Sequence, residues 1–460
     1  HLFWALGALI FLLLTVLITL SLPIMARYIV DGYVFNIETG QKYLYIGCAL
    51  VAVAACGTAI RFYLITLLGE RLVSDLRQAL FDQIINLSPN FFEKTLTGDL
   101  VSRINADTTL VQSVAGSTLS LAVRNSLLLL GGVILMFSTS IKLASFSLLI
   151  IPILIFPLLY FGRFLRKLTR QTQDKLADSA GLASEYIFAA TTIQTNSYQE
   201  HAVNEYNNII EDSYLKSKTR VLARAIMIFL IIILVFLAIS FVVWAGLKDV
   251  ESGGFSIGEL LQFCLYSLVV GVSIGAITET FGELSKFLGA LDRIGEILST
   301  LDTVKEPVKP ITMKTPIQGS IRFEKVEFAF PSRKESLALD IPNLTINENE
   351  KVALVGLSGA GKTTLFQLIQ RLYDPLKGSI SIDTYPIDRI SKKYLRQQIA
   401  YVPQEPVIFS KSVIDNIRIG RVGASIEEVE QAVKLACAEE FIKDLPEGYS
   451  TLLGLSLIHI

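Results

Sequence analysis

The sequence predicts an all-α membrane domain of six spanning helices with long cytoplasmic helical extensions, followed by an α/β domain. Three observations predict this fold class. The chain of 460 residues is 52% hydrophobic and only 18% charged, with a mean hydropathy of +0.52. Stretches without charge that are long enough to cross a bilayer all lie before Leu298. After that residue, short strand-like runs alternate with helix-like runs, which is typical of an α/β domain.

Six segments are apolar enough to span a bilayer, which requires about 20 residues in a helix. We place the membrane domain at residues 1–300, with spans at about 1–26, 43–68, 118–140, 143–163, 225–247 and 260–281. The segment 225–247 is the clearest, because it is rich in Leu, Ile, Val and Phe. A cleaved secretory signal is the alternative for residues 1–26. That segment has neither a preceding basic region nor a small-residue cleavage site.

The basic residues between spans predict the orientation. The connection 162–224 holds nine Lys or Arg residues, whereas 247–258 holds only Lys248. Cytoplasmic loops carry the excess of basic residues, so the long connections and both termini are expected in the cytoplasm. The polar stretches 70–85 and 175–210 are amphipathic and free of proline, which predicts helices that continue the spans into the cytosol.

Two arginines, Arg61 and Arg124, lie near the cytoplasmic ends of the second and third spans. One interpretation is that their side chains extend to the lipid head groups. The other is that they contact an anionic substrate.

Charge and cysteine content exclude other classes of protein. The net charge of -1 argues against a nucleic-acid partner, because such proteins carry a basic surface. The four cysteines are too scattered for a disulfide framework or a zinc site.

A change of composition marks the second domain. Pro307, Pro310 and Pro316 interrupt a polar stretch, so residues 301–318 are interpreted as a linker and 319–454 as a partial soluble domain. Strand-like runs are expected at 320–323, 326–330, 344–346 and 352–355, with a helix at 363–372.

The chemistry is concentrated in the run GLSGAGKTT at residues 356–364, between the last expected strand and that helix. Its glycines let successive backbone N–H groups point inward at a polyphosphate, and the start of the helix adds its positive dipole end. Lys362 is expected to bridge the β- and γ-phosphates, and the Thr363 hydroxyl to bind Mg²⁺. The second domain is therefore an α/β P-loop NTPase domain. The residues expected to bind ATP in this loop are Gly356, Ser358, Gly359, Ala360, Gly361, Lys362, Thr363 and Thr364.

With this motif the sequence resembles the ATP-binding cassette (ABC) exporters, whose half-transporters join six membrane spans to one nucleotide-binding domain. The resemblance covers residues 1 to about 454. It implies that Phe330 stacks on adenine, where tyrosine is more usual. It also implies that Gln404, in Tyr-Val-Pro-Gln-Glu, is the Q-loop glutamine, which contacts Mg²⁺ or the attacking water and relays to the membrane domain.

The membrane half carries further matches to this family. Phe91-Phe92-Glu93-Lys94 and the run 97–100 resemble its first cytoplasmic loop, whose coupling helix docks on a nucleotide-binding domain. Two adjacent aromatics on a polar loop need a partner. The second loop is expected to turn near residues 201–212, where a second coupling helix and a solvated helical hairpin are both open interpretations.

Several motifs of the family are missing from the sequence. No LSGGQ-like signature, Walker B carboxylate or switch histidine is present, and the chain does not begin with Met. We expect a fragment that cannot hydrolyse ATP. We also expect residues 455–460 to be a non-native tail, because a common transposase adapter end encodes the same string.

The resemblance implies an ABC-type transport ATPase that exports a hydrophobic or amphipathic substrate by alternating access. Its cofactors would be ATP and Mg²⁺, and its partners membrane lipid and a second half-transporter, in a homodimer or a heterodimer. We expect an integral protein of a bacterial plasma membrane, with its ATP-binding domain in the cytoplasm. The alternative function is a membrane-anchored P-loop regulator or sensor that binds ATP without transport. The substrate is not predicted.

Overall fold

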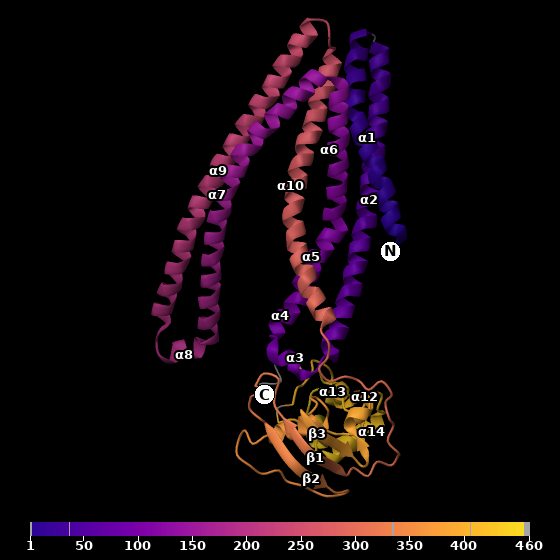
Figure 1. Ribbon diagram of the computed structural model, residues 1–460, viewed down its shortest axis with the longest axis vertical. Helices are drawn as coiled ribbons and strands as arrows, with labels where there is room; N and C mark the ends of the chain where they lie inside the picture. The colour runs from indigo at the N-terminus through magenta and orange to yellow at the C-terminus, as the bar shows by residue number, and fades with distance from the viewer. Residues whose placement is uncertain (1, 36, 334, 405, 455–460) are drawn as a thin grey trace. The chain divides into compact units, whose positions relative to one another are not determined.

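The computed structural model describes residues 2–35, 37–333, 335–404 and 406–454, which form two compact units (Figure 1). The first unit comprises residues 1–81 and 102–298, and the second comprises 82–101 and 299–460. The second unit therefore includes a short piece of the first expected cytoplasmic loop. The suspected tail at 455–460 lies outside the described residues.

The first unit is built from long helices. They are α1 Leu2–Phe35, α2 Ile37–Asn86, α6 Leu119–Thr139, α7 Ile141–Phe188, α9 Gln199–Glu251 and α10 Ile257–Ser299. Its shorter helical segments are η1 Arg103–Asp107, α5 Thr108–Ser113, η2 Val114–Thr118 and α8 Ala190–Thr195. The helix α4 Thr97–Ser102 belongs to the second unit except for Ser102.

Five stretches of the described helices are long and apolar enough to cross a membrane. They are Leu2–Tyr33, Ile37–Asn86, Thr97–Thr139, Gln199–Glu251 and Ile257–Ser299. Each overlaps one of the expected spans. The remaining expected span, 143–163, lies in α7, where several side chains between 151 and 159 are outside the described residues. The limits of all six spans stay predictions.

The helices α7 and α9 run side by side and are joined at one end through α8 (Figure 1). Between them, Lys175 Nζ on α7 lies 3.8 Å from a carboxylate oxygen of Asp212 on α9. The prediction of a turn at 201–212 is wrong, because that stretch is continuous helix in α9. The chain reverses at 189–198 instead. There, Ser197 adopts a left-handed φ of 54°, which a continuing right-handed helix does not allow.

Close contacts join the long helices at several points along their length. The buried Phe263 and Tyr266 of α10 lie in one apolar cluster with residues of α6, α7 and α9. The Tyr266 hydroxyl also donates to the carbonyl of Leu20 at 2.9 Å, which links α10 to α1. Two backbones approach closely at Gly69 on α2, where an added Cβ would lie 2.8 Å from the Cα of Gly116 in η2.

The second unit contains an antiparallel sheet in the order β2-β1-β3-β4. The strands are β1 Ile321–Phe328, β2 Leu339–Ile346, β3 Lys377–Ile382 and β4 Tyr385–Pro386. The helices are α3 Pro89–Lys94, α11 Lys362–Ile369, η3 Ile387–Arg389, α12 Lys392–Gln397, α13 Val413–Arg418, α14 Ile426–Leu435, α15 Glu439–Lys443 and η4 Gly448–Ser450.

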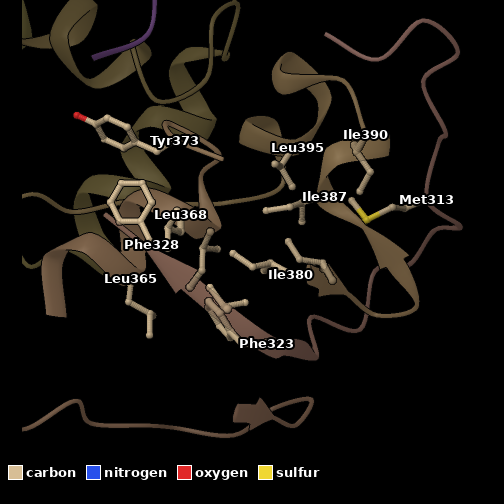
Figure 2. Close-up of a cluster of buried hydrophobic side chains, with 13 residues drawn as sticks. Met313, Phe323, Phe328, Leu365, Leu368, Tyr373, Ile380, Ile387, Ile390 and Leu395 are labelled. Atoms are coloured by element: carbon tan, nitrogen blue, oxygen red, sulfur yellow. The ribbon is translucent and has the colours of Figure 1, made fainter. Parts of the chain in front are cut away.

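The core of this unit lies where α11 and the segment 387–395 pack against β1 and β3. Figure 2 shows Phe323 and Phe328 of β1 among side chains that include Leu368 and Ile380. Met313 joins this core although residues 300–320 form no helix or strand. The expected linker is therefore partly packed into the second unit.

The mixed α/β character is confirmed, as is the strand character of the runs before 331, but the strand prediction at 352–355 is wrong. The runs 320–323 and 326–330 form the single strand β1, with a register shift between Glu324 and Glu327. The run 352–355 is not a strand, and Val355 is 91% exposed. No strand among the described residues pairs with it, and a strand without neighbours leaves its N–H and C=O groups unsatisfied.

The contact between α2 and η2 provides a test of the first unit. We expect Gly69→Ala to destabilise the protein by about 1 to 3 kcal/mol. The atoms that the added Cβ would meet all belong to backbone and cannot rotate away. The matched control is Gly181→Ala on α7, where an added Cβ meets nothing within 4 Å. Thermal unfolding in detergent should show a lower Tm for the first variant and an unchanged or higher Tm for the second. Equal Tm values would contradict the close approach.

Candidate functional site

The loop that precedes α11 contains two glycines in a conformation that other residues rarely adopt. Gly359 and Gly361 adopt left-handed φ values of 86° and 83°. At Gly361, an added Cβ would lie 2.5 Å from Cδ2 of Leu339 and 2.7 Å from the carbonyl oxygen of Ala338. Only glycine fits there, for both conformational and steric reasons. The start of α11 can therefore lie directly against the beginning of β2.

Lys362 is the first residue of α11, and its side chain turns back over the loop. Its Nζ donates to the carbonyl oxygens of Gly356 and Leu357, both at 2.8 Å. The loop is also closed by the Ala360 N–H, which donates to the Leu357 carbonyl at 3.1 Å. The lysine charge thus lies on the loop that the helix N-terminus faces, and both favour an anion.

A cleft of about 410 Å³ adjoins this helix. Thr363 and Gln404, the two residues expected to contact Mg²⁺, both line it. Its other lining residues are Phe366, Ile369, Gln370, Ile399, Ala400, Tyr401, Val402 and Pro403. The structure thus brings together one hydroxyl and one amide from segments about 40 positions apart in the sequence. Among the described residues, no group of three His, Cys, Asp or Glu side chains could hold a metal.

The other expected site residues occupy different positions. Ser358 is exposed on the loop, whereas Thr364, a residue of α11, is buried. Phe330 does not line the cleft. Its half-buried ring packs edge-to-face on Phe328 and Tyr373, with ring centroids 5.0 and 5.5 Å away. Its stacking on adenine stays a prediction.

The second unit also contains a polar junction that the sequence did not predict. The Tyr373 hydroxyl donates to the carboxylate of Glu93 in α3. In Figure 2, the Tyr373 ring lies beside Phe328 and its hydroxyl points away from the other labelled side chains. Burial, together with the bond to Glu93, raises the pKa of Tyr373. A single tyrosine carries no sequence signal for such a role.

A second part of this junction is centred on Asp302. Its Oδ1 accepts the Ser88 N–H at 3.1 Å, and its Oδ2 accepts from Lys392 Nζ at 2.6 Å. Burial opposes ionisation of Asp302. The hydrogen bonds from Lys392, Ser88 and Val304 outweigh burial and lower its pKa. Residues 82–101 are therefore attached to the rest of the unit by charge-assisted bonds.

The aromatic pair at 91–92 contributes less to this attachment than the sequence predicts. Phe91 is half-buried and Phe92 is 41% exposed. The two rings contact each other edge-to-face, with centroids 5.5 Å apart. Tyr373, Glu93, Ser88 and Asp302 supply the specific contacts instead.

Comparison with known families identifies both parts of the chain. Residues 5–274 match the family model described as ABC transporter transmembrane region, and residues 339–454 match the family model described as ABC transporter. The first match alone covers more than half of the 460 residues.

Similar proteins come from bacteria, animals and fungi. A Rickettsia typhi protein whose name describes an export ATP-binding/permease protein is 32% identical over 91% of this chain and 72% of its own length. The mitochondrial ATP-binding cassette sub-family B member 10 of Mus musculus is 34% identical, over 96% of this chain and 63% of the mouse protein. An ATP-dependent permease of Candida albicans is 32% identical, over 93% and 63%. The chain belongs to the ABC transporter family, as an exporter-type half-transporter in which an integral membrane domain precedes a partial ATPase domain.

Proposed function

We propose that this chain is one half of a dimeric exporter that uses ATP to move a hydrophobic or amphipathic substrate across a membrane. The observation that carries the proposal is the loop at 356–361. Its left-handed glycines and the lysine at the start of α11 suit a polyphosphate. The same chain carries helices long and apolar enough to cross a membrane. A second copy or a related half-transporter would complete the dimer.

Each residue of the loop has a distinct proposed role toward ATP. The backbone N–H groups around Gly359 and Gly361 would hold the phosphates, and Lys362 would exchange its two carbonyl partners for the β- and γ-phosphates. Thr363 and Gln404, which share one cleft, would hold Mg²⁺, whose remaining ligands would be phosphate oxygens and water. When bound, Mg²⁺ would neutralise charge on the phosphates.

The location of the protein is part of the proposal. The basic residues of the connection 162–224 favour a cytoplasmic side for the long loops, and hence for the ATPase domain. The Rickettsia relative supports a bacterial plasma membrane. The name of the mouse relative includes the word mitochondrial, which supports a mitochondrial membrane as the alternative.

The proposed route of coupling runs through the polar junction. Glu93 and Ser88 belong to the first cytoplasmic loop, and they contact Tyr373 and Asp302 of the ATPase part. A movement of this part would pull on α3 through charge-assisted bonds, which are about twice as strong as neutral ones. A membrane-anchored regulator without transport would not need this link.

Nucleotide binding can be tested at Lys362. We expect Lys362→Ala to weaken ATP binding about 10- to 100-fold, because ATP loses one charged hydrogen-bonding partner. AMP binding should stay almost unchanged, since AMP lacks the β- and γ-phosphates. Titration calorimetry on the purified chain measures both. The exposed Lys351 is the control, and Lys351→Ala should change neither affinity. Equal losses for ATP and AMP would contradict the assigned role.

Coupling can be tested at Tyr373. In the chain extended by its natural downstream sequence, we expect Tyr373→Phe to leave ATP binding intact. ATP-driven efflux of a hydrophobic dye from proteoliposomes should fall several-fold per ATP hydrolysed, because Glu93 loses its partner. The control is Tyr385→Phe, at a half-buried tyrosine on β4. An unchanged ratio of efflux to hydrolysis would remove the junction from the coupling route. Efflux that does not depend on ATP in the unsubstituted protein would favour a regulator.

Catalytic competence of the 460 residues can be tested directly. The printed sequence contains no LSGGQ-like signature and no Walker B carboxylate, so no residue is assigned to activate the attacking water. We expect the chain to bind a fluorescent ATP analogue while phosphate release stays at background, and extension with the downstream sequence to restore turnover. Phosphate release from the 460-residue chain that disappears in Lys362→Ala would show that another residue supplies this function.

A further inference from the structure

Two arginines lie inside the apolar part of the first unit. Arg61 of α2 is only 5% exposed, and its Nη1 donates to the Ser120 hydroxyl of α6 at 2.5 Å. Arg124 follows Ser120 by one helical turn on α6 and is half-buried. Residues four apart share a face of a helix, so the two guanidinium groups approach the same place. The positive charge of Arg124 accordingly acts on Arg61.

Neither arginine is neutralised within the part of the chain that the structure describes. The Nε atoms of both are buried and have no hydrogen-bond partner there. Two glutamates on the adjoining helices accept hydrogen bonds from neutral side chains, and among the described residues neither forms an ion pair with Arg61 or Arg124. Glu70 of α2 accepts from Gln112 at 2.5 Å, and Glu283 of α10 accepts from Thr118 at 2.5 Å. Within the described residues, the pair thus presents two positive charges and two Nε–H donors without a carboxylate paired to either.

Extension to the lipid head groups does not explain Arg61. That arrangement places the charged end of the side chain at the membrane surface, whereas nearly all of Arg61 is buried by neighbouring helices. Two like charges close together in apolar surroundings repel each other and lose hydration. An anion at this position would relieve both costs and would use the donors that lack partners.

We propose that Arg61 and Arg124 bind the phosphate or carboxylate head group of an amphipathic molecule within the first unit. Guanidinium groups suit these two anions because their parallel N–H donors match two oxygens of one head group. The surrounding helices are apolar, so the remainder of the ligand is hydrocarbon or aromatic. The site itself does not depend on ATP. Only the statement that its ligand is the exported substrate rests on the proposed function.

The test compares two lipids that share one acyl chain and differ in head-group charge. Binding of lysophosphatidic acid and of lysophosphatidylcholine to the nucleotide-free protein in detergent is measured by microscale thermophoresis. We expect the anionic lipid to bind at least tenfold more tightly. Arg61→Gln and Arg124→Gln should each reduce this ratio to near one. The control Arg71→Gln removes an exposed arginine of α2 that pairs with Asp75 at 3.2 Å, and it should leave the ratio unchanged.

Further arms separate the possible outcomes. Arg61→Gln should keep its affinity for lysophosphatidylcholine, which separates a loss of head-group preference from a loss of folding. Inorganic phosphate should compete only weakly, and competition as strong as that of lysophosphatidic acid would overturn the amphipathic ligand. Equal binding of both lipids, or an equal loss in Arg71→Gln, would overturn the site. Because no nucleotide is added, these outcomes are independent of ATP binding at Lys362.

Discussion

The nucleotide site depends on one steric constraint, the absence of a side chain at Gly361. Gly361 has a φ of 83°, and an added Cβ would lie only 2.7 Å from the Ala338 carbonyl oxygen, so glycine lets α11 begin against β2. β2 in turn is paired with β1 along its length, from Ile321 opposite Ile346 to Phe328 opposite Leu339. Lys362 and Thr363 are the first residues after this contact, so the rigid sheet fixes the position from which both act. The packing of the sheet thus fixes where the loop and these two side chains lie.

In the same unit, polar contacts attach residues 82–101 to the rest of the ATPase part. A half-buried carboxylate such as Asp302 loses part of its hydration, and hydrogen bonds from Lys392 and the Ser88 N–H offset that loss. Tyr373 combines both kinds of contact. Its ring packs on Phe328 and Phe330 in the core, and its hydroxyl reaches Glu93. One residue thereby links the core of the ATPase part to the first cytoplasmic loop.

Local patterns in the sequence predicted the long helices and the glycine-rich turn into α11 because those features are encoded locally. Charge-free runs mark the long helices, and three glycines before Lys362 mark the turn into α11. Features that depend on distant partners could not be predicted in this way. The apolar run 352–355 has the composition of a strand, but a strand exists only where a neighbour pairs with it. In the same way, the bond between Tyr373 and Glu93 joins positions 280 residues apart. The burial of Arg61 likewise depends on how α2 packs against α6.

The central claim is that the loop at 356–361 and Lys362 hold the phosphates of ATP. The most direct test is a cryo-electron microscopy structure of the protein with Mg²⁺ and a non-hydrolysable ATP analogue. Our account predicts that Lys362 Nζ leaves the carbonyls of Gly356 and Leu357, from which it now lies 2.8 Å, and lies within hydrogen-bonding distance of the β- and γ-phosphates. It also predicts Mg²⁺ density between Thr363 and Gln404, in the cleft that they share. Phosphate density away from this loop, or a Lys362 that keeps both carbonyl bonds with the analogue bound, would contradict it.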